Sequence, residues 1–374
     1  MRIGILGGGQ LGRMLVLAGA PLGLNFRIFE PSAEAPAAQL APHVCAEYDD
    51  FAALYEFVQG VDVVTYEFEN VPLECAEWLA QRVPVYPPVD ALRVGQERLR
   101  EKDFFTKLGI PTPAYVAVDT RDDLRAASEA VGLPAVLKTR QFGYDGKGQM
   151  LLRTAADVET AWERLGGRPL IYEAFVPFTR ELSQLAVRST GGELAYFAAV
   201  ENVHRHGILY RSRPLPPGEP AAALAREYAG RILSALDYVG VLAVEFFDLD
   251  GHLLANEMAP RVHNSGHWTI EGAVTSQFAQ HLRAILGLPL GSCETLGWPA
   301  MLNLIGSTPS LAAMLAWPRV YPHLYGKKAR PGRKLGHITI VARNPEERDE
   351  LLSHIERLLD PARSATTPSP LSSL

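Results

Sequence analysis

The chain has 374 residues, of which 42 are acidic and 36 are Lys or Arg, so its formal net charge is -6 at pH 7. Proteins that bind nucleic acid through its phosphates are usually basic, so this charge argues against that class. Apolar residues make up 47% and charged residues 21% of the chain, which is typical of a globular protein and excludes disorder over most of its length. The length suggests two or three domains.

The cysteines and the apolar runs exclude further classes of protein. Cys45, Cys75 and Cys293 are far apart and form no CxxC pair, which excludes a disulfide scaffold and the usual zinc knuckles. Reduced thiols in a cytoplasmic protein are therefore expected. No apolar run reaches the roughly 18 residues of a membrane span, and the N-terminal apolar stretch is too short for a signal peptide. We expect no membrane partner and no nucleic-acid partner.

The first third of the chain alternates predicted strands with predicted helices. A helix from 11 to about 19 follows a glycine turn, and strands are expected at 2–6, 25–30, 61–68 and 83–88. This βαβ rhythm predicts a mostly parallel sheet covered by helices. We place the first domain boundary close to residue 98.

The middle of the chain is richer in strands and is predicted to be antiparallel. Helices are expected at 99–108, 220–236 and 278–286, and strands at 135–140, 170–175, 183–188, 195–200, 241–247 and 253–258. A connector at 288–299 leads to a small C-terminal unit with a basic loop, a strand at 337–341 and a loose Ser/Pro-rich tail. The fold class is therefore α/β and α+β, with expected domains 1–98, 99–290 and 291–374.

A glycine turn, Gly7–Gly12, has the form G-x-G-x-x-G and lies between the first strand and a helix. Glu30 ends the next strand about 20 residues later, as in a dinucleotide-binding fingerprint. The turn alone is not decisive, because a helix N-terminus attracts any phosphate. We favour a sugar phosphate or a purely structural turn over a dinucleotide.

Polar groups follow the buried strand near residue 66. Glu67, Glu69 and Asn70 stand there, and ligands of open α/β sheets collect at the carboxyl ends of strands. A carboxylate at this place can hold ribose hydroxyls. A polar strand end that faces water explains the segment equally well.

Lys138 leaves an apolar strand and is followed by the loop 141–148, which holds three glycines and Lys147. Glycines let backbone amides approach phosphates, and the two lysines add positive charge. The loop joins two strands and lacks the GK[ST] of a Walker A loop, so it predicts a flexible flap of a different nucleotide fold. The alternatives are a lysine that reaches solvent and a plain hairpin.

Two glutamates, Glu245 and Glu257, flank the turn at Asp250 and Gly251. Mg²⁺ prefers oxygen ligands, and carboxylates on adjacent strands supply them. A two-residue turn would place the glutamates on opposite faces, so we predict a three-residue loop or an equivalent bulge. Asn256 can complete the ligand set. Solvent-facing carboxylates are the alternative, but Glu245 interrupts an apolar run and needs compensation there.

Two later segments are dense in polar groups. The first, 260–269, contains Arg261, His263 and His267, which favour an anion or substrate pocket over a zinc site, because no third ligand is evident. The second, 327–334, holds five positive charges. This basic loop can form a phosphate pocket, a solvated surface loop or an RNA contact. The net negative charge of the chain disfavours the RNA contact.

Taken together, these segments resemble the ATP-grasp superfamily, and within it the N5-carboxyaminoimidazole ribonucleotide synthetases. The resemblance runs in order through GGGQLGRM at 7–14, TYEFEN at 65–70, FGYDGKGQ at 142–149, NEMAPRVHNSGHWT at 256–269 and RPGRKLGH at 330–337. The last two strings are the most specific. The resemblance implies an N-terminal Rossmann-like domain, a central ATP-grasp domain and a small C-terminal domain.

The resemblance also implies an activity. ATP and bicarbonate would form carboxyphosphate, which carboxylates the exocyclic amine of 5-aminoimidazole ribonucleotide, with ATP and one or two Mg²⁺ ions as cofactors. A homodimer is implied, as is transfer of the product to a separate mutase. The implied metal ligands are Glu245 and Glu257, and the groups facing bicarbonate and the amine are Tyr144, Asp145, Arg261, His263 and Lys334.

The remaining implied contacts divide between nucleotide and ribonucleotide. Those to ATP are Arg98, Lys138, Gly143, Gly146, Lys147, Gly148, Glu173, Ala174, Phe175, Val176, Glu181, His204 and Asn256. Those to the ribonucleotide are Gln10, Leu11, Glu69, Asn264, Ser265, Lys327 and Arg330.

Three other functions compete with this one. A nicotinamide-dependent oxidoreductase would use the glycine turn but leaves Lys138, the glycine flap and the two glutamates unexplained. A related ATP-grasp ligase, such as a formate-dependent transformylase or biotin carboxylase, shares the ATP half and differs at 261–269 and 330–337. A non-catalytic nucleotide-binding regulator would have no need of both glutamates.

Overall fold

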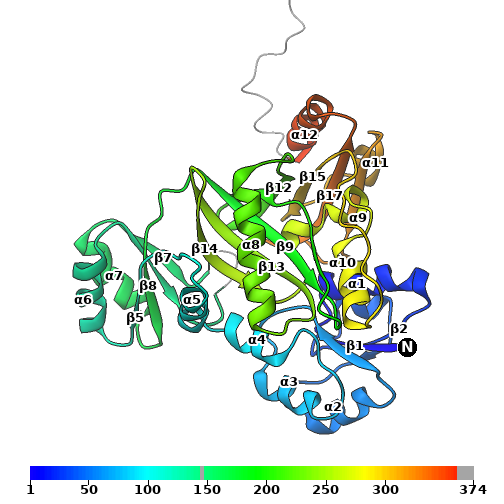
Figure 1. Cartoon of the computed structure of the whole chain (residues 1–374), viewed down its shortest axis with the longest axis horizontal. Helices are drawn as coiled ribbons and strands as arrows, with labels where there is room; N and C mark the ends of the chain where they lie inside the picture. Colours follow the sequence, from blue (N-terminus) through cyan, green and yellow to red (C-terminus); the bar gives the residue numbers. More distant parts are fainter. Residues whose placement is uncertain (144–146, 360–374) are drawn as a thin grey trace, which may run out of the picture.

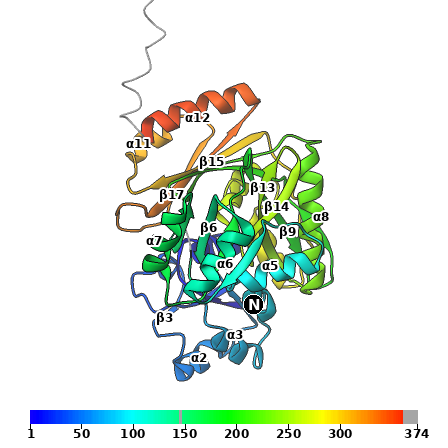
Figure 2. The same cartoon turned by 90° about the vertical axis from the view of Figure 1, so that its left-hand side faces the viewer.

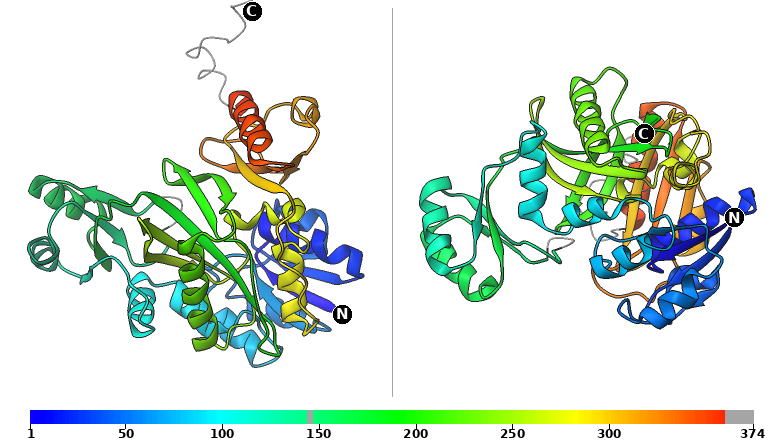
Figure 3. Two further views of the ribbon diagram at one scale, coloured as in Figure 1. Left: turned by 45° about the horizontal axis from the view of Figure 1, so that its top comes forward. Right: turned by 60° about the horizontal axis from the view of Figure 1, so that its bottom comes forward.

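The computed structural model describes residues 1–143 and 147–359, and three regions are distinct in it (Figure 1). A small sheet with two helices stands at one end, the N-terminal sheet stands at the other, and a large sheet joins them, as two further views confirm (Figure 3). Seen from the side, the C-terminal helices lie above the large sheet and the N-terminal helices lie at the opposite edge (Figure 2). Across these two ranges, no helix combines the length and apolar character needed to cross a membrane.

The N-terminal region is a parallel four-stranded sheet of order β3-β2-β1-β4, as predicted. Its strands are β1 (Arg2–Leu6), β2 (Asn25–Phe29), β3 (His43–Val44) and β4 (Val63–Tyr66). Its helices are α1 (Gln10–Gly19), α2 (Phe51–Val58) and α3 (Leu73–Ala80), with short 3₁₀ turns η1 (Ala20–Leu22) and η2 (Pro36–Gln39). The expected strand at 83–88 is wrong: only Val85 forms a bridge, to Val64, because the three prolines of the segment have no N–H to donate.

Helices α4 (Val89–Gly95) and α5 (Arg98–Lys107) lead to the small sheet, whose strands are antiparallel in the order β5-β8-β6-β7. The strands are β5 (Tyr115–Val118), β6 (Ala135–Thr139), β7 (Gln149–Leu152) and β8 (Leu170–Ala174). Helices α6 (Arg121–Val131) and α7 (Ala155–Leu165) each begin with a threonine–aspartate capping box, which satisfies their first amide groups.

The large sheet is antiparallel and has the order β14-β13-β9-β11-β12-β15-β17-β16, with β10 paired to β9. Its strands are β9 (Arg180–Arg188), β10 (Leu194–Tyr196), β11 (Val200–Arg205), β12 (Ile208–Pro214), β13 (Gly240–Leu249), β14 (His252–Ala259), β15 (Trp298–Ile305), β16 (Val320–Leu324) and β17 (Lys334–Ala342). Its helical segments are α8 (Pro220–Ala235), η3 (Asn264–Gly266), α9 (Thr269–Gly272), α10 (Gln277–Ile285), α11 (Leu311–Leu315) and α12 (Pro345–Leu359). The C-terminal strands continue this sheet through the pairing of β12 with β15, which local sequence does not reveal.

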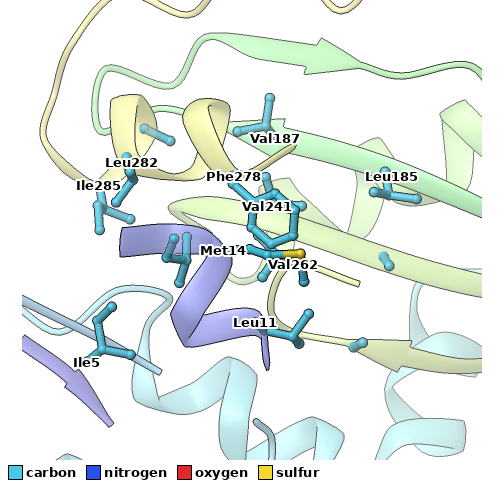
Figure 4. Packing of buried hydrophobic residues seen from close by; sticks show 14 of the residues in the cluster. Ile5, Leu11, Met14, Leu185, Val187, Val241, Val262, Phe278, Leu282 and Ile285 are labelled. Carbon is cyan, nitrogen blue, oxygen red and sulfur yellow. The ribbon is translucent and has the colours of Figure 1, made fainter. Parts of the chain in front are cut away.

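The N-terminal sheet is fastened to the large sheet by a shared core. Helix α1 packs between β1 and α10, where Leu11 and Met14 meet Val241, Phe278 and other buried side chains (Figure 4). The hydroxyl of Thr65 also lies 2.8 Å from Nε2 of His281, joining β4 to α10. The glycine turn at the start of α1 is thereby held at a fixed place beside β13 and β14, which carry the two glutamates.

Candidate functional site

A cavity of about 410 Å³ lies where the three regions meet. Its lining includes residues of α1, the loop after β4, the loop between β6 and β7, the hairpin β13–β14 and the start of β17. The predicted site residues that line it are Gln10, Leu11, Glu69, Arg98, Lys138, Gly143, Lys147, Glu181, His204, Glu245, Asn256, Glu257, Arg261, His263, Asn264 and Lys334. The fold therefore gathers candidates that are separated by more than 300 positions in the sequence.

Other predicted residues lie outside the cavity lining. They are Gly148, Glu173, Ala174, Phe175, Val176, Ser265, Lys327 and Arg330. Glu173 and Ser265 are buried behind the lining, whereas Arg330 is exposed. Tyr144, Asp145 and Gly146 lie outside the described residues, as does the tail predicted after residue 362.

The two glutamates face each other across the hairpin β13–β14. Glu245 pairs directly with Glu257, although only Asp250 and Gly251 form the turn. Both turn residues have positive φ, as tight two-residue hairpin turns require. The predicted three-residue loop is wrong, but the alternative, a bulge, is confirmed: Asn256 is the extra residue on β14, and it returns both carboxylates to one face.

The donor set on this hairpin suits a hard cation. Burial and the charge of Glu257 raise the pKa of Glu245 to about 7. Burial also opposes ionisation of Glu257, but the Arg98 guanidinium 2.8 Å away outweighs it and lowers the pKa of that carboxyl. Oδ1 of Asn256 is buried without a hydrogen-bond partner among the described residues. Two facing carboxylates and an orphaned amide oxygen fit Mg²⁺.

Helix α5 clamps the bulged strand with charged side chains, which sequence reasoning largely missed. Arg98 pairs with Glu257, Glu101 accepts a hydrogen bond from the Met258 amide (2.7 Å), and Lys102 donates to the Asn256 carbonyl (2.6 Å). Both Glu101 and Lys102 are buried. The spacing of these residues is the signal of their burial. Arg98, Glu101, Lys102 and Phe105 occupy positions i, i+3, i+4 and i+7 of the helix, where an amphipathic helix normally buries apolar residues.

Lysines on the nucleotide side share one buried carboxylate. Glu173 lies 2.9 Å from Nζ of Lys138 and 3.6 Å from Nζ of Lys102. Burial raises the pKa of Glu173, but the two lysines outweigh it and hold that pKa at about 2. The predicted phosphate-binding Lys138 is therefore ion-paired and pre-oriented at the edge of the cavity.

The opposite wall of the nucleotide side carries a carboxylate–imidazole pair and an aromatic pair. Nδ1 of His204 lies 2.6 Å from Glu181. Burial lowers the pKa of His204, but this hydrogen bond and the charges of Glu245, Glu181 and Glu257 together outweigh it and raise that pKa. The rings of Phe178 and Phe247 stack with centroids 4.9 Å apart. Sequence reasoning missed the aromatic pair, because the two rings come from different elements with no shared motif.

On the other side of the cavity, Arg261 pairs with Glu69. Nδ1 of His263 accepts from the Ser265 amide (3.3 Å), which leaves the proton on Nε2, 3.3 Å from Glu245. Burial and the charges of Arg261 and Lys334 lower the pKa of His263, so its ring is neutral. His267 is also buried and neutral; it packs against Phe278, and its Nδ1 lies 3.2 Å from Nε2 of Gln277.

The glycine turn is bonded to glutamates of its own domain. Glu67 accepts from the amides of Gly9 (2.5 Å) and Gly12 (2.8 Å), and Glu30 accepts from the amide of Gly8 (3.1 Å). These are the groups with which a helix N-terminus would bind a pyrophosphate. The arrangement argues against the dinucleotide alternative. Glu67 is a further residue to which the sequence analysis gave no role of its own.

Comparisons with known proteins match most of the chain. A model of the ribonucleotide synthetase preATP-grasp domain matches residues 1–96, a model of the ATP-grasp domain matches 103–278, and a model of the phosphoribosylaminoimidazole carboxylase C-terminal domain matches 299–351. The N5-carboxyaminoimidazole ribonucleotide synthase of Pseudomonas aeruginosa is 52% identical over 96% of this chain and 100% of its own length.

Solved structures agree with these matches. The N5-carboxyaminoimidazole ribonucleotide synthetase of Thermus thermophilus superposes with a TM-score of 0.92 at 55% identity, covering 96% of this chain and 98% of its own. The Aspergillus clavatus synthase, in complex with ADP and 5-aminoimidazole ribonucleotide, superposes with a TM-score of 0.88 at 34% identity, covering 97% and 98%. The expected fold class is thereby confirmed, and the chain belongs to the N5-carboxyaminoimidazole ribonucleotide synthase family of ATP-grasp enzymes.

Proposed function

We propose that this enzyme uses ATP and bicarbonate to carboxylate the exocyclic amine of 5-aminoimidazole ribonucleotide, which gives N5-carboxyaminoimidazole ribonucleotide in purine biosynthesis. One observation carries the proposal. A single cavity brings the cations of the nucleotide side, two facing glutamates and the polar groups of the N- and C-terminal regions to one place. Family membership adds the identity of the ribonucleotide.

On the nucleotide side, Arg98 and Lys138 hold the ATP phosphates, and the loop 143–148 closes over them. Each cation is paired with a carboxylate, Glu257 or Glu173, which orients it before ATP arrives. Residues 173–176 form the edge for adenine, and Glu181 binds ribose beside His204. Because phosphoryl transfer depends mainly on positioning and charge neutralisation, these cations supply most of what the step requires.

The hairpin glutamates Glu245 and Glu257, with Asn256, hold one or two Mg²⁺ ions. When bound, the metal would neutralise the charge that develops on the transferred phosphoryl group. His263 supports this hairpin site from the cavity lining, since its Nε2–H points at Glu245.

The reaction itself proceeds in two steps. A bicarbonate oxygen attacks the γ-phosphorus, ADP leaves, and carboxyphosphate forms. The amine nitrogen then bonds to the carboxyl carbon of carboxyphosphate, or to CO₂ released from it. The carbon–oxygen bond to the phosphate breaks, and the departing inorganic phosphate takes the proton that the nitrogen loses. Arg261 and His263, with Tyr144 and Asp145 of the flap, face these reactants, and the closed flap excludes water from the labile intermediate.

The ribonucleotide occupies the side of the cavity that the N- and C-terminal regions share. Gln10, Leu11 and Glu69 bind its ribose and base, with Asn264 and Ser265 beside them. Arg330 neutralises its phosphate together with one of the two lysines Lys327 and Lys334, and the other lysine reaches the reacting amine.

Further proposals follow from the resemblance. We propose a cytoplasmic homodimer that passes its product to a separate mutase, with domains close to 1–98, 99–290 and 291–374.

The test measures ADP release with ATP, Mg²⁺ and bicarbonate, with and without 5-aminoimidazole ribonucleotide. Strong stimulation by the ribonucleotide, together with loss of its free amine, is expected. Turnover of ATP that ignores the ribonucleotide would move the substrate to another amine or acid, and no turnover would contradict the proposal.

A matched pair of variants locates the ribonucleotide. Lys334→Met removes a cation from the cavity, whereas Lys328→Met removes one from the same basic segment at an exposed position, 79% accessible. The first should lower stimulation by the ribonucleotide about tenfold or more, the effect of losing about 1.4 kcal/mol of binding. The second should leave it unchanged. Equal effects would contradict a specific role for Lys334.

A further inference from the structure

Glu67 and the glycine turn are built around each other. The backbone amide of Glu67 donates a hydrogen bond to the Leu6 carbonyl (3.0 Å). This bond fixes Glu67 at the end of β4, directly beside the turn that follows β1. Its two oxygens then reach the amides of Gly9 and Gly12. A Cβ atom on Gly7 or Gly9 would overlap the Glu67 side chain, so glycine is required at both positions for the carboxylate to fit.

The turn leads directly into a residue that lines the cavity. Gln10 is the first residue of α1, and its Oε1 accepts a hydrogen bond from Nζ of Lys327. Glu67 does not line the cavity and is only 7% exposed. It is hydrogen-bonded to the amide of Gly9, the residue that precedes Gln10 in the chain. The position of Gln10, and with it the position of Lys327, therefore depends on the bonds that Glu67 makes.

We propose that Glu67 is a positioning residue for the ribonucleotide: its carboxyl group accepts two amides of the glycine turn, fixes that turn and so places Gln10 and Lys327. The role rests on the proposed function, since it assigns the ribonucleotide to this side of the cavity. Glu67 takes the hydrogen bonds that a phosphate takes in dinucleotide-binding turns, and the turn is thereby converted from a ligand site into a rigid support.

The substitution Glu67→Gln tests this role. A glutamine has the same shape but only one accepting oxygen, so one of the two amides loses its partner and the turn must shift. The KM for 5-aminoimidazole ribonucleotide should rise about tenfold, the usual loss when a group that supports a binding residue is removed. The KM for ATP should stay within about twofold, because the nucleotide side is untouched.

Two controls separate positioning from simple loss of stability. Glu34→Gln removes an exposed carboxylate that pairs with Lys328, and it should change neither constant. A destabilised enzyme would lose active molecules, which lowers kcat and leaves KM unchanged. Glu67→Asp retains the carboxyl group one methylene short of the amides, and it should raise the same KM, which gives a second test if Glu67→Gln folds poorly.

A double-mutant cycle tests the route through Gln10. If Glu67 acts by placing Gln10, then adding Glu67→Gln to the Gln10→Ala variant should raise the KM for the ribonucleotide little beyond its value in Gln10→Ala alone. Fully additive effects, or an unchanged KM in folded Glu67→Gln, would overturn the positioning role. Wild-type enzyme that the ribonucleotide fails to stimulate would overturn the proposed function itself, so the two failures are distinguishable.

Discussion

Lys102 is the residue whose replacement tests the buried charge network most directly. Its side chain has no exposed surface, and its Nζ donates to the carbonyls of Asn256 (2.6 Å) and Ala255 (3.2 Å) and lies 3.6 Å from Glu173. The substitution Lys102→Met has nearly the same length and no charge. It removes this donor from two strand carbonyls, and it removes one of the two lysines that lie beside Glu173, so that only Lys138 of the pair remains.

The size of the effect follows from Glu173. Burial raises its pKa, but Lys102, followed by Lys138, lowers it from an ordinary 4.5 to about 2. That difference, to which Lys102, Lys138 and Arg98 all contribute, is worth about 3–4 kcal/mol at about 1.4 kcal/mol per pH unit. Removing one partner of a buried ion pair usually costs about 3–5 kcal/mol, so we expect a loss of about 3 kcal/mol. With an unfolding entropy of about 2.1 cal/mol/K per residue over 374 residues, Tm should fall by about 4 °C.

The assay is thermal unfolding at pH 7, followed by circular dichroism, with Lys107→Met as the control. Lys107 lies on the same helix but is exposed, so its loss should shift Tm by less than about 1 °C. A Tm for Lys102→Met equal to that of the control would refute the reasoning, because it would mean that the buried ammonium contributes no net stabilisation.

Three other outcomes are expected. Glu257→Gln should abolish ATP turnover while the fold survives, and wild-type turnover in this variant would contradict the metal assignment. The folded-state pKa of Glu173 lies below its ordinary value, so its contribution is present above about pH 4.5 and disappears as the pH falls towards 2; acid-unfolding curves of Glu173→Gln should therefore be flatter than those of the wild type in that window. Thr65→Val should cost about 1–3 kcal/mol, because it leaves buried Nε2 of His281 unpaired, and an unchanged denaturation midpoint would show that water or another group replaces the hydroxyl.

The sequence pointed to many of the residues that line the cavity, because these residues belong to short local patterns. A glycine-rich flap after Lys138, the two glutamates about a hairpin turn and the polar run around Arg261 each have a short-range signature, and the cavity lining includes residues of all three. The hairpin shows the limit of such patterns. The face that Glu245 and Glu257 share depends on a bulge at Asn256, and a bulge is set by the strands on either side and by the clamp from α5.

The residues that sequence reasoning missed are those whose partners are distant in the chain. Glu101 and Lys102 look like solvent-facing charges on a polar helix, yet they are buried because their partners arrive on a strand some 150 positions later. Glu67 likewise has a role only because β4 lies next to β1 and brings its carboxylate to the glycine turn.

The sequence by itself therefore determined the class of elements, the family and the chemical groups of the site. Hydrophobic periodicity, turn glycines and charged strand ends act over a few residues and need no partner to be read. Only the tertiary structure decided which charges are buried, which carboxylates support the site from behind and how the C-terminal strands extend the large sheet. A buried charge is stable only when its partner is in place, and the fold alone brings partners together from opposite ends of the chain.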